Sequence, residues 1–374
     1  MSGELPTDTH KPENPSEKPM ELKTDTITVD LKRMATDLNY GKQLSQGKGF
    51  RIYNEAFTKI LGSDPSITQV QSRDYQFAHE AGVYIKSTNR VYFTANFQTC
   101  DPIALYSVDA STLEVSDDDF SDVVQANGAC NYKDKILYCC QGSKTSPSAL
   151  VLVDPSTSNS NSEILITNFQ GRAFNSINDV ITHHANDDIW FTDPTYGYEQ
   201  AFRPIPDLPS QIYRYKPSTG EVWCVADGFA QCNGLCFSPD YATLYVTDTG
   251  ACQAHSGPGD GHNFSMNPRL PATIYEYDVV EHGTKLANRR VFAYCDNGVP
   301  DGIKCDEAGN VYSGCGDGVH VWDKQGTLIG KVVVGGCVAN FCFSREGMWM
   351  FGEEELYLCK LGGVKGALVG IECE

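Results

Sequence analysis

The amino-acid sequence predicts an all-β fold, a six-bladed β-propeller closed by an N-terminal strand. The first observation is that short runs of Val, Ile, Tyr and Phe alternate with polar residues and end at Gly, Asp, Asn or Pro, whereas helical periodicity is scarce. The second is internal repetition between about residues 75 and 361. The repeats average about 48 residues, which is the size of a four-stranded propeller blade.

Each repeat has a short apolar strand that starts at a polar residue, then a polar turn, then an aromatic-rich strand. The six begin at His79, Asn127, Asn178, Asn233, Asp301 and Asn340. Several continue into a third strand that ends in aspartate, such as ALVLVDPST. The earlier segment 51–71 resembles the later strands of the fifth repeat, and we expect it to supply the outer strand that closes the last blade. Such closure removes a free sheet edge.

Residues 1–25 are rich in Pro, Glu, Lys, Thr and Ser, which predicts a disordered leader before a single propeller domain over 26–374. The N-terminus lacks the basic and apolar regions of a secretory signal, and no apolar run approaches the length of a membrane span. The 15 cysteines show no paired CxxC spacing. We therefore expect a cytoplasmic protein with reduced, mostly buried thiols.

The chain is acidic, with 29 Lys and Arg against 48 Asp and Glu and a formal charge of −19. This balance argues against nucleic acid and anionic membranes as main partners, because both require a surplus of basic residues. It favours solubility and the attraction of cations, and it leaves the oligomeric state open.

Aligning the repeats on their first strand places one polar residue at the same position every time. In a propeller this strand lines the central channel, so the six side chains should converge on the axis. Taken singly, Asn-Gly and Asp-Gly dipeptides are more typical of turns. Recurrence in every repeat instead favours a shared site. The ring consists of Glu80, Asn127, Asn178, Asn233, Asp301 and Asn340.

The chemistry of this ring favours a hard cation. Burying carboxylates and carboxamides without partners costs free energy, and a metal ion supplies the partner. Glu80 and Asp301 contribute negative charge, whereas Asn178 and Asn233 contribute neutral oxygens. Calcium takes six to eight oxygen ligands, so it suits this set, although another divalent cation is an alternative. The ring contains no His or Cys, which disfavours zinc.

Four motifs in order resemble the gluconolactonase/regucalcin (senescence marker protein) family of six-bladed propellers. They are HEAGVY, SINDVITHHANDDIWFTDPTYGY, CNGLCFSPDYATLYVTDTG and VPDGIKCDEAGNVYSGCGDGVHVWDKQGTLIGKV. The run QGSKTSPSALVLVDPST is similar to the fungal lactonohydrolase branch. The resemblance implies a calcium-dependent hydrolase of lactones with its ligands at Glu80, Asn178, Asn233 and Asp301. Paraoxonase-like relatives have a histidine pair where this chain has Asn127 and Gln141, which argues against a histidine base.

The second strand of each repeat should end on the same face as the ring, so the following loops should form the pocket wall. The loops after Asp193 and Asp248 are long, and loops of that size are often lids. We expect substrate contacts from Asn127, Gln141, Tyr196, Tyr198, Asp248 and His255.

For lactone hydrolysis, calcium would polarise the carbonyl and a carboxylate would activate water. The family resemblance assigns the base to Asp301, with Glu80 second and Asp248 third. Two alternatives stay open: a metal-dependent enzyme of another kind, such as a phosphotriesterase-like propeller, and a non-enzymatic calcium-binding propeller. Retention of the four ligand positions argues against a metal-free condensing enzyme.

Overall fold

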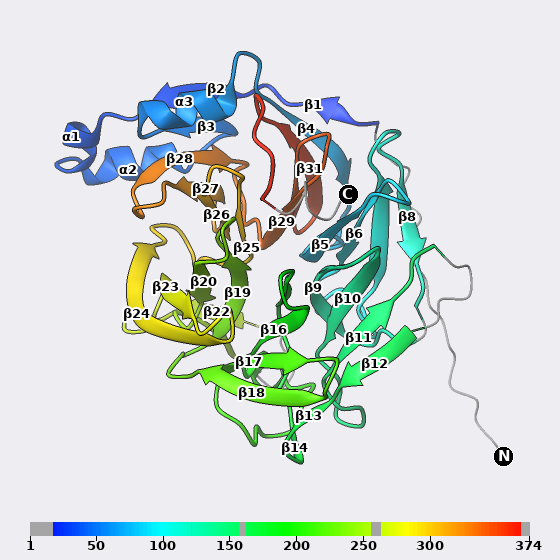
Figure 1. Cartoon of the computed structure of the whole chain (residues 1–374). Helices are drawn as coiled ribbons and strands as arrows, with labels where there is room; N and C mark the ends of the chain where they lie inside the picture. The colour runs from blue at the N-terminus through cyan, green and yellow to red at the C-terminus, as the bar shows by residue number, and fades with distance from the viewer. Residues whose placement is uncertain (1–17, 121, 157–161, 256–262, 368–374) are drawn as a thin grey trace.

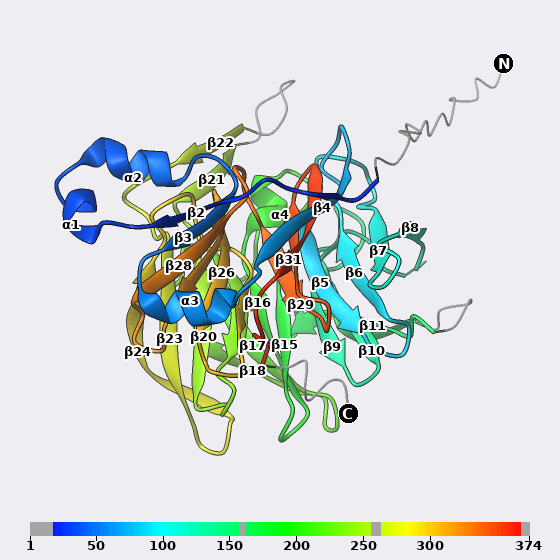
Figure 2. The ribbon, with the colours of Figure 1, turned by 90° about the horizontal axis from the view of Figure 1, so that it is seen from above.

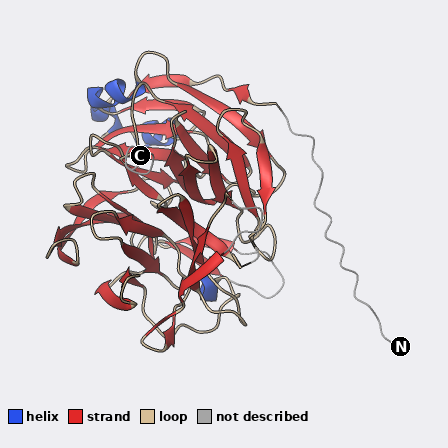
Figure 3. Ribbon diagram, turned by 45° about the vertical axis from the view of Figure 1, so that its right-hand side comes forward, coloured by secondary structure: helices blue, strands red, loops and turns tan. Residues whose placement is uncertain are grey.

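The structure is a computed structural model that describes residues 18–120, 122–156, 162–255 and 263–367. Figure 1 shows sheets arranged in a ring around a central axis, and Figure 3 shows that strands dominate while most of the helices lie at the edge of the ring. The predicted six-bladed β-propeller is confirmed, because six sheets of four or more strands follow one another along the chain, all antiparallel except for the outermost pair of strands in one of them.

In each of the first three blades, four consecutive strands run from the axis outward. Blade 1 consists of β5 (Glu80–Ile85), β6 (Arg90–Thr94), β7 (Leu105–Asp109) and β8 (Val115–Asp118). Blade 2 consists of β9 (Ala126–Tyr132), β10 (Lys135–Cys140), β11 (Ala149–Val153) and β12 (Ser162–Ile166). Blade 3 follows the short hairpin β13 (Asn168–Phe169) and β14 (Arg172–Ala173), and consists of β15 (Val180–His183), β16 (Asp188–Asp193), β17 (Gln211–Lys216) and β18 (Glu221–Ala226).

Among the last three blades, blade 4 contains an inserted hairpin. Blade 4 consists of β19 (Cys232–Phe237), β20 (Thr243–Asp248), β23 (Thr273–Val280) and β24 (Lys285–Tyr294), with the hairpin β21 (Cys252–His255) and β22 (Asn263–Met266) inserted after β20. Blade 5 consists of β25 (Ile303–Cys305), β26 (Val311–Cys315), β27 (Gly318–Trp322) and β28 (Leu328–Val333). Blade 6 consists of β29 (Asn340–Phe343), β30 (Met348–Gly352) and β31 (Glu355–Lys360).

The N-terminal segment supplies outer strands to two blades rather than one. The closing strand is β4 (Ser66–Ser72), which pairs antiparallel with β31, so the predicted closure of the last blade is confirmed. The same segment also contains β3 (Gly49–Ile52), which extends blade 5 beside β28. Beyond β3 lies β2 (Asp25–Thr28), and beyond β4 lies β1 (Met20–Glu21).

Three short helices accompany these N-terminal strands, and strand-like periodicity alone did not predict them. They are α1 (Leu31–Met34), α2 (Leu38–Leu44) and α3 (Glu55–Leu61), each preceded by an Asp or Asn whose side chain accepts backbone N–H groups of the first turn. The leader boundary at 25 also differs from the structure, because β1 lies inside it and pairs with β4. Residues 1–17 lie outside the described part of the chain.

The blades pack face to face through aromatic and branched side chains, which explains the repeated Tyr and Phe of the second strands. Phe93 of blade 1 stacks on Phe351 of blade 6 with ring centroids 5.3 Å apart. Phe191 of blade 3 stacks on Tyr213 of the same blade at 5.5 Å. Burial of such large side chains contributes most of the stability of the ring.

Near the axis, neighbouring blades are joined by a repeated hydrogen bond. The hydroxyls of Thr94, Thr192 and Thr247 donate to the backbone oxygens of Asn127, Asn233 and Asp301 in the next blade, at 3.3, 2.7 and 2.9 Å. The glycines after the ring residues belong to this contact: a Cβ at Gly128, Gly234 or Gly302 would collide with the next blade. The Asn-Gly and Asp-Gly dipeptides at these positions are therefore sites where the blades approach closely, and they are not turns.

Across the described residues, no helix is long and apolar enough to cross a membrane.

Candidate active site

The ring predicted from the sequence lies around a hollow of about 540 Å³ at one end of the inner strands. Five of the six ring residues line it, and the sixth, Asn340, lies behind Glu80. The lining also includes Gln141 and Tyr196, two of the predicted substrate contacts. The ring members that face the hollow are Glu80, Asn127, Asn178, Asn233 and Asp301.

The two carboxylates of the hollow are held in an environment that disfavours their charge. Nδ2 of Asn340 donates to Oε2 of Glu80 at 2.7 Å, which positions the Glu80 side chain. Burial raises the pKa of Glu80, and burial together with the negative charge of Glu80 holds the pKa of Asp301 well above its usual range. Two buried carboxylates that repel one another are a setting that a bound cation would stabilise.

The oxygen donors of this hollow fit calcium. Oδ1 of Asn178 and Oδ1 of Asp301 are buried and make no hydrogen bond within the described part of the chain. Such orphaned oxygens cost free energy unless a ligand or ion pairs with them. With Glu80 and Asn233 they provide carboxylate and amide oxygens only, which are the ligands that a hard cation prefers.

A histidine and a glutamate that contact one another, His79 and Glu353, border the ring. The sequence analysis did not assign a role to either residue. Nδ1 of His79 lies 2.8 Å from Oε1 of Glu353, and Nδ2 of Asn96 donates to Oε2 of Glu353 at 3.1 Å. Burial opposes protonation of His79, but the charge and the hydrogen bond of Glu353, together with the negative charges of Glu80 and Asp301, outweigh burial and raise the pKa of His79 to about 9. The signal was present in the sequence, because His79 directly precedes Glu80 and Glu353 follows a second strand.

The long loops after β16 and β20 form part of the wall, as predicted. The first contains α4 (Tyr196–Glu199), and the hydroxyl of Tyr196 bonds to Oγ1 of Thr249 at the start of the second. Figure 2 shows α4 and the β21–β22 hairpin at the same end of the ring. The sequence analysis did not identify the remaining wall residues, because the segments around them have the composition of ordinary loops and strands. These residues include Phe97, Gln200, Cys252, Phe264 and Val299.

Three predicted substrate contacts are not placed in the hollow. Asp248 is fully buried, and its carboxylate accepts the backbone N–H groups of Ala230, Gln231 and Gly250 at 3.0, 2.9 and 3.2 Å. It is therefore a structural residue, which corrects its assignment as a substrate contact and as a third candidate base. Tyr198 points to solvent with 47% of its surface exposed. The side chain of His255 lies outside the described residues.

The role of Asp248 can be tested by Asp248→Asn. We expect a loss of about 2–4 kcal/mol in the free energy of unfolding, because an amide cannot accept all three N–H groups and one NH₂ would face a donor. Chemical denaturation measures this loss, with Glu114→Gln on the exposed surface as control. A folded variant with an altered KM and unchanged stability would contradict the structural role.

A second hollow, of about 800 Å³, lies further along the inner strands. It is lined mainly by apolar and aromatic side chains such as Tyr84, Phe237 and Phe343, and none of the described residues that line it is a carboxylate. The chemistry therefore assigns the candidate active site to the acidic hollow.

Sequence comparison identifies the family. The sequence profile described as "SMP-30/Gluconolactonase/LRE-like region" matches residues 80–351, which begins at the ring residue Glu80 and ends in the last blade. The chain belongs to this family. Lactonohydrolase oryL of Aspergillus oryzae is 31% identical over 323 residues, covering 82% of this chain and 73% of that protein. Lactonohydrolase oryH of the same fungus is 26% identical, covering 84% and 79%.

Solved structures support the fold of this family member. A gluconolactonase from Xanthomonas campestris superimposes with a TM-score of 0.69 at 22% identity, over 93% of this chain and 99% of that one. Regucalcin from Agrobacterium tumefaciens, described as a calcium-binding protein, superimposes with a TM-score of 0.56 at 14% identity, over 80% and 94%. At these identities the likeness establishes the propeller architecture.

Proposed function

We propose that this family member hydrolyses lactones in the acidic hollow, with calcium held by Glu80, Asn178, Asn233 and Asp301. The observation that carries the proposal is the convergence of four oxygen donors, two of them buried and without a hydrogen bond to any described residue, in a chain similar to a lactonohydrolase. When bound, calcium supplies Lewis-acid polarisation of the substrate carbonyl and stabilises the negative charge that develops on its oxygen.

The residues of the chain supply the proton transfers and the positioning. Asp301 takes a proton from the attacking water while the water oxygen bonds to the carbonyl carbon. The ring C–O bond then breaks, and the same proton passes to the departing ring oxygen to give a hydroxy acid. Asp301 suits this role because its carboxylate has two oxygens, one for calcium and one for the water, and because Oδ1 makes no hydrogen bond to the described residues. Glu80 is the second candidate, but Asn340 already occupies one of its oxygens.

The wall of the hollow would orient the lactone. The amides of Asn127 and Gln141 and the hydroxyl of Tyr196 offer hydrogen bonds, and Oε1 of Gln141 is buried and has no partner in the described part of the chain. Phe97 and Phe264 provide apolar surface on the same wall. This mixture suits a small ring with an ester group and few other polar atoms.

A panel of γ- and δ-lactones tests the proposal, assayed with and without a chelator. We expect ring opening that the chelator stops and added calcium restores, measured by release of acid. Turnover that the chelator leaves unchanged would contradict the role of calcium. Bound calcium without turnover would favour a non-enzymatic binding protein, and preferential cleavage of aryl phosphotriesters would favour the phosphotriesterase alternative.

We also infer a reducing, cytoplasmic location. Nine of the 14 cysteines in the described residues are buried, and no disulfide joins two of these 14. Buried thiols of this kind act as small apolar side chains and persist most readily where disulfides are rare.

A further inference from the structure

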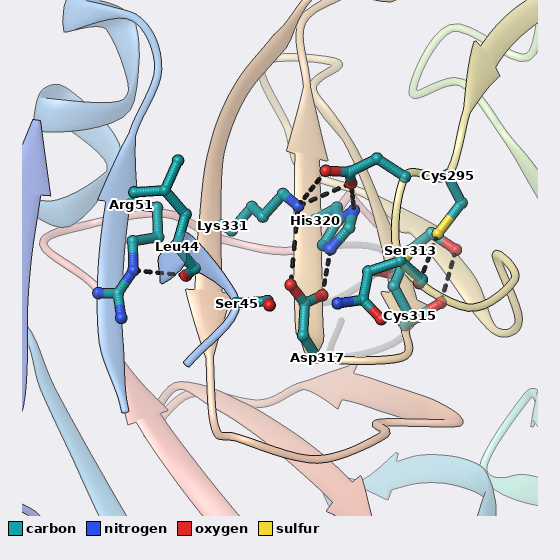
Figure 4. A network of polar contacts seen from close by, with 12 residues as sticks. Leu44, Ser45, Arg51, Cys295, Ser313, Cys315, Asp317, His320 and Lys331 are labelled. Carbon is teal, nitrogen blue, oxygen red and sulfur yellow. Dashed lines mark hydrogen bonds and ion pairs between the residues drawn. The ribbon is translucent and has the colours of Figure 1, made fainter. Parts of the chain in front are cut away.

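A second group of metal-binding side chains lies in and beside blade 5, away from the lining of the hollow. Cys295 follows β24, Cys315 ends β26, and His320 lies within β27. All three are almost completely buried, and their donor atoms lie within 4.8 Å of one another. Figure 4 shows the two cysteines on one side of His320 and the charged residues Asp317 and Lys331 on the other.

One ring nitrogen of His320 donates a hydrogen bond to a carboxylate, and the other makes no hydrogen bond to the described residues. Nε2 lies 2.6 Å from Oδ1 of Asp317 and donates to it. Nδ1 is buried and makes no hydrogen bond to the residues that the structure describes, with Oδ1 of Asp296 3.5 Å away. A neutral imidazole that donates through one nitrogen keeps a lone pair on the other, so Nδ1 is the atom available to a ligand.

The donor types indicate which ion would suit this cluster. Two thiols and an imidazole are soft or borderline ligands, which zinc prefers, whereas calcium requires hard oxygen donors. Metal-binding histidines almost always donate their second N–H to a carboxylate or carbonyl, and Asp317 occupies that place here. The cluster is therefore chemically distinct from the ring of the hollow.

The charges around the cluster also favour a cation. Lys331 lies 2.7 and 2.8 Å from the two oxygens of Asp296 and 3.7 Å from Oδ2 of Asp317. The two carboxylates of Asp296 and Asp317 thus outnumber the single ammonium of Lys331. The surroundings of the cluster are therefore negatively charged even while both thiols are protonated. The thiols donate to backbone oxygens, Cys295 to Asn297 at 3.0 Å and Cys315 to Ser313 at 3.5 Å. Metal binding would release those protons.

We propose that Cys295, Cys315 and His320 form a zinc-class metal site, with Asp317 orienting the imidazole. Water or the carboxylate of Asp296 completes a tetrahedron. A metal bound there would restrain the segment 295–301, which leads to the candidate base Asp301. That segment already contacts the blade, since the backbone N–H of Gly316 donates to the oxygen of Asn297 at 2.9 Å.

Cobalt titration of the reduced full-length protein tests this site in saturating calcium, so that the ring is filled. We expect one equivalent of Co²⁺ to produce thiolate-to-cobalt charge-transfer absorption, which zinc abolishes by displacement and calcium leaves unchanged. The absorption should be lost in Cys295→Ser and in His320→Gln. In Asp317→Asn, which keeps all three ligands, we expect affinity to fall by about 10–100-fold.

Cys305→Ser is the matched control. Sγ of Cys305 lies 3.7 Å from Sγ of Cys236, so this variant also alters a buried pair of thiols, but the three proposed ligands are untouched. It should bind cobalt as the wild type does. Absence of the charge-transfer band in wild-type protein with free thiols, or its persistence in His320→Gln, would overturn the site. A Cys295–Cys315 disulfide found by mass spectrometry in protein from a reducing cytosol would also overturn it. These readouts are independent of lactone hydrolysis.

Discussion

Asp301→Ala is expected to lower lactone hydrolysis by about 10²–10⁴-fold or more, because it removes the proposed general base and one calcium ligand together. The propeller should survive the change. The backbone of Asp301 accepts from Thr247 of blade 4 at 2.9 Å and donates to Gly314 of its own blade at 2.9 Å, and alanine keeps both hydrogen bonds. Steady-state kinetics and circular dichroism on the same preparation measure the two effects.

Asp301→Asn separates the two functions of the side chain. The amide oxygen can still ligate calcium, whereas the amide cannot accept a proton from water. We expect this variant to keep much of its calcium-dependent thermal stabilisation while kcat falls as far as in Asp301→Ala. Wild-type turnover by either variant would show that another group is the base.

Glu80→Gln is expected to have opposite effects on the metal-free and calcium-loaded protein. Without metal, the raised pKa values of Glu80 and Asp301 mean that their ionised forms destabilise the fold. Stability should therefore fall as pH rises above the usual carboxyl range near 4, and removing one charge should relieve this loss. With calcium, the variant loses a charged ligand and should bind more weakly.

Thermal unfolding across pH, with chelator or with excess calcium, measures both effects. In the wild type, calcium at 100 times its dissociation constant should add about 2.7 kcal/mol. We expect Glu80→Gln to unfold at a higher temperature than wild type in chelator at neutral pH, and to gain less from calcium. Asn127→Ala is the control, because Asn127 lines the hollow without serving as a proposed ligand. A Glu80→Gln variant that gains as much from calcium as the wild type would contradict the ligand assignment.

The fold could be predicted from the repeat pattern, because the residues that define each blade lie close together along the chain. Each blade contains strand periodicity and turn residues within about 48 residues, so the sequence displays the unit six times. The helices α1 to α3 were missed because they are short and depend on tertiary contact. Arg51, for example, is fully buried, and its guanidinium donates to the backbone oxygen of Leu44 at 2.8 Å and to Oδ1 of Asp25 at 2.7 Å. The contact with Leu44 is visible in Figure 4.

Position in the repeat was a weaker guide to the role of a side chain. Asp193 and Asp248 both end second strands, and both turn back to accept backbone N–H groups 17 and 18 residues earlier. Glu353 ends the equivalent region of blade 6, yet it contacts His79 at the hollow. Side-chain direction and local backbone geometry distinguish these cases, and neither is encoded by spacing alone.

The sequence by itself determined the propeller, its closure by an N-terminal strand and the ring residues that line the hollow, because all three follow from repetition along the chain. Only the tertiary structure decided that Asn340 supports Glu80, that Asp248 is structural, and that two cysteines and a histidine meet in and beside blade 5. These contacts depend on the direction of each side chain and on how the blades pack, and spacing along the chain encodes neither.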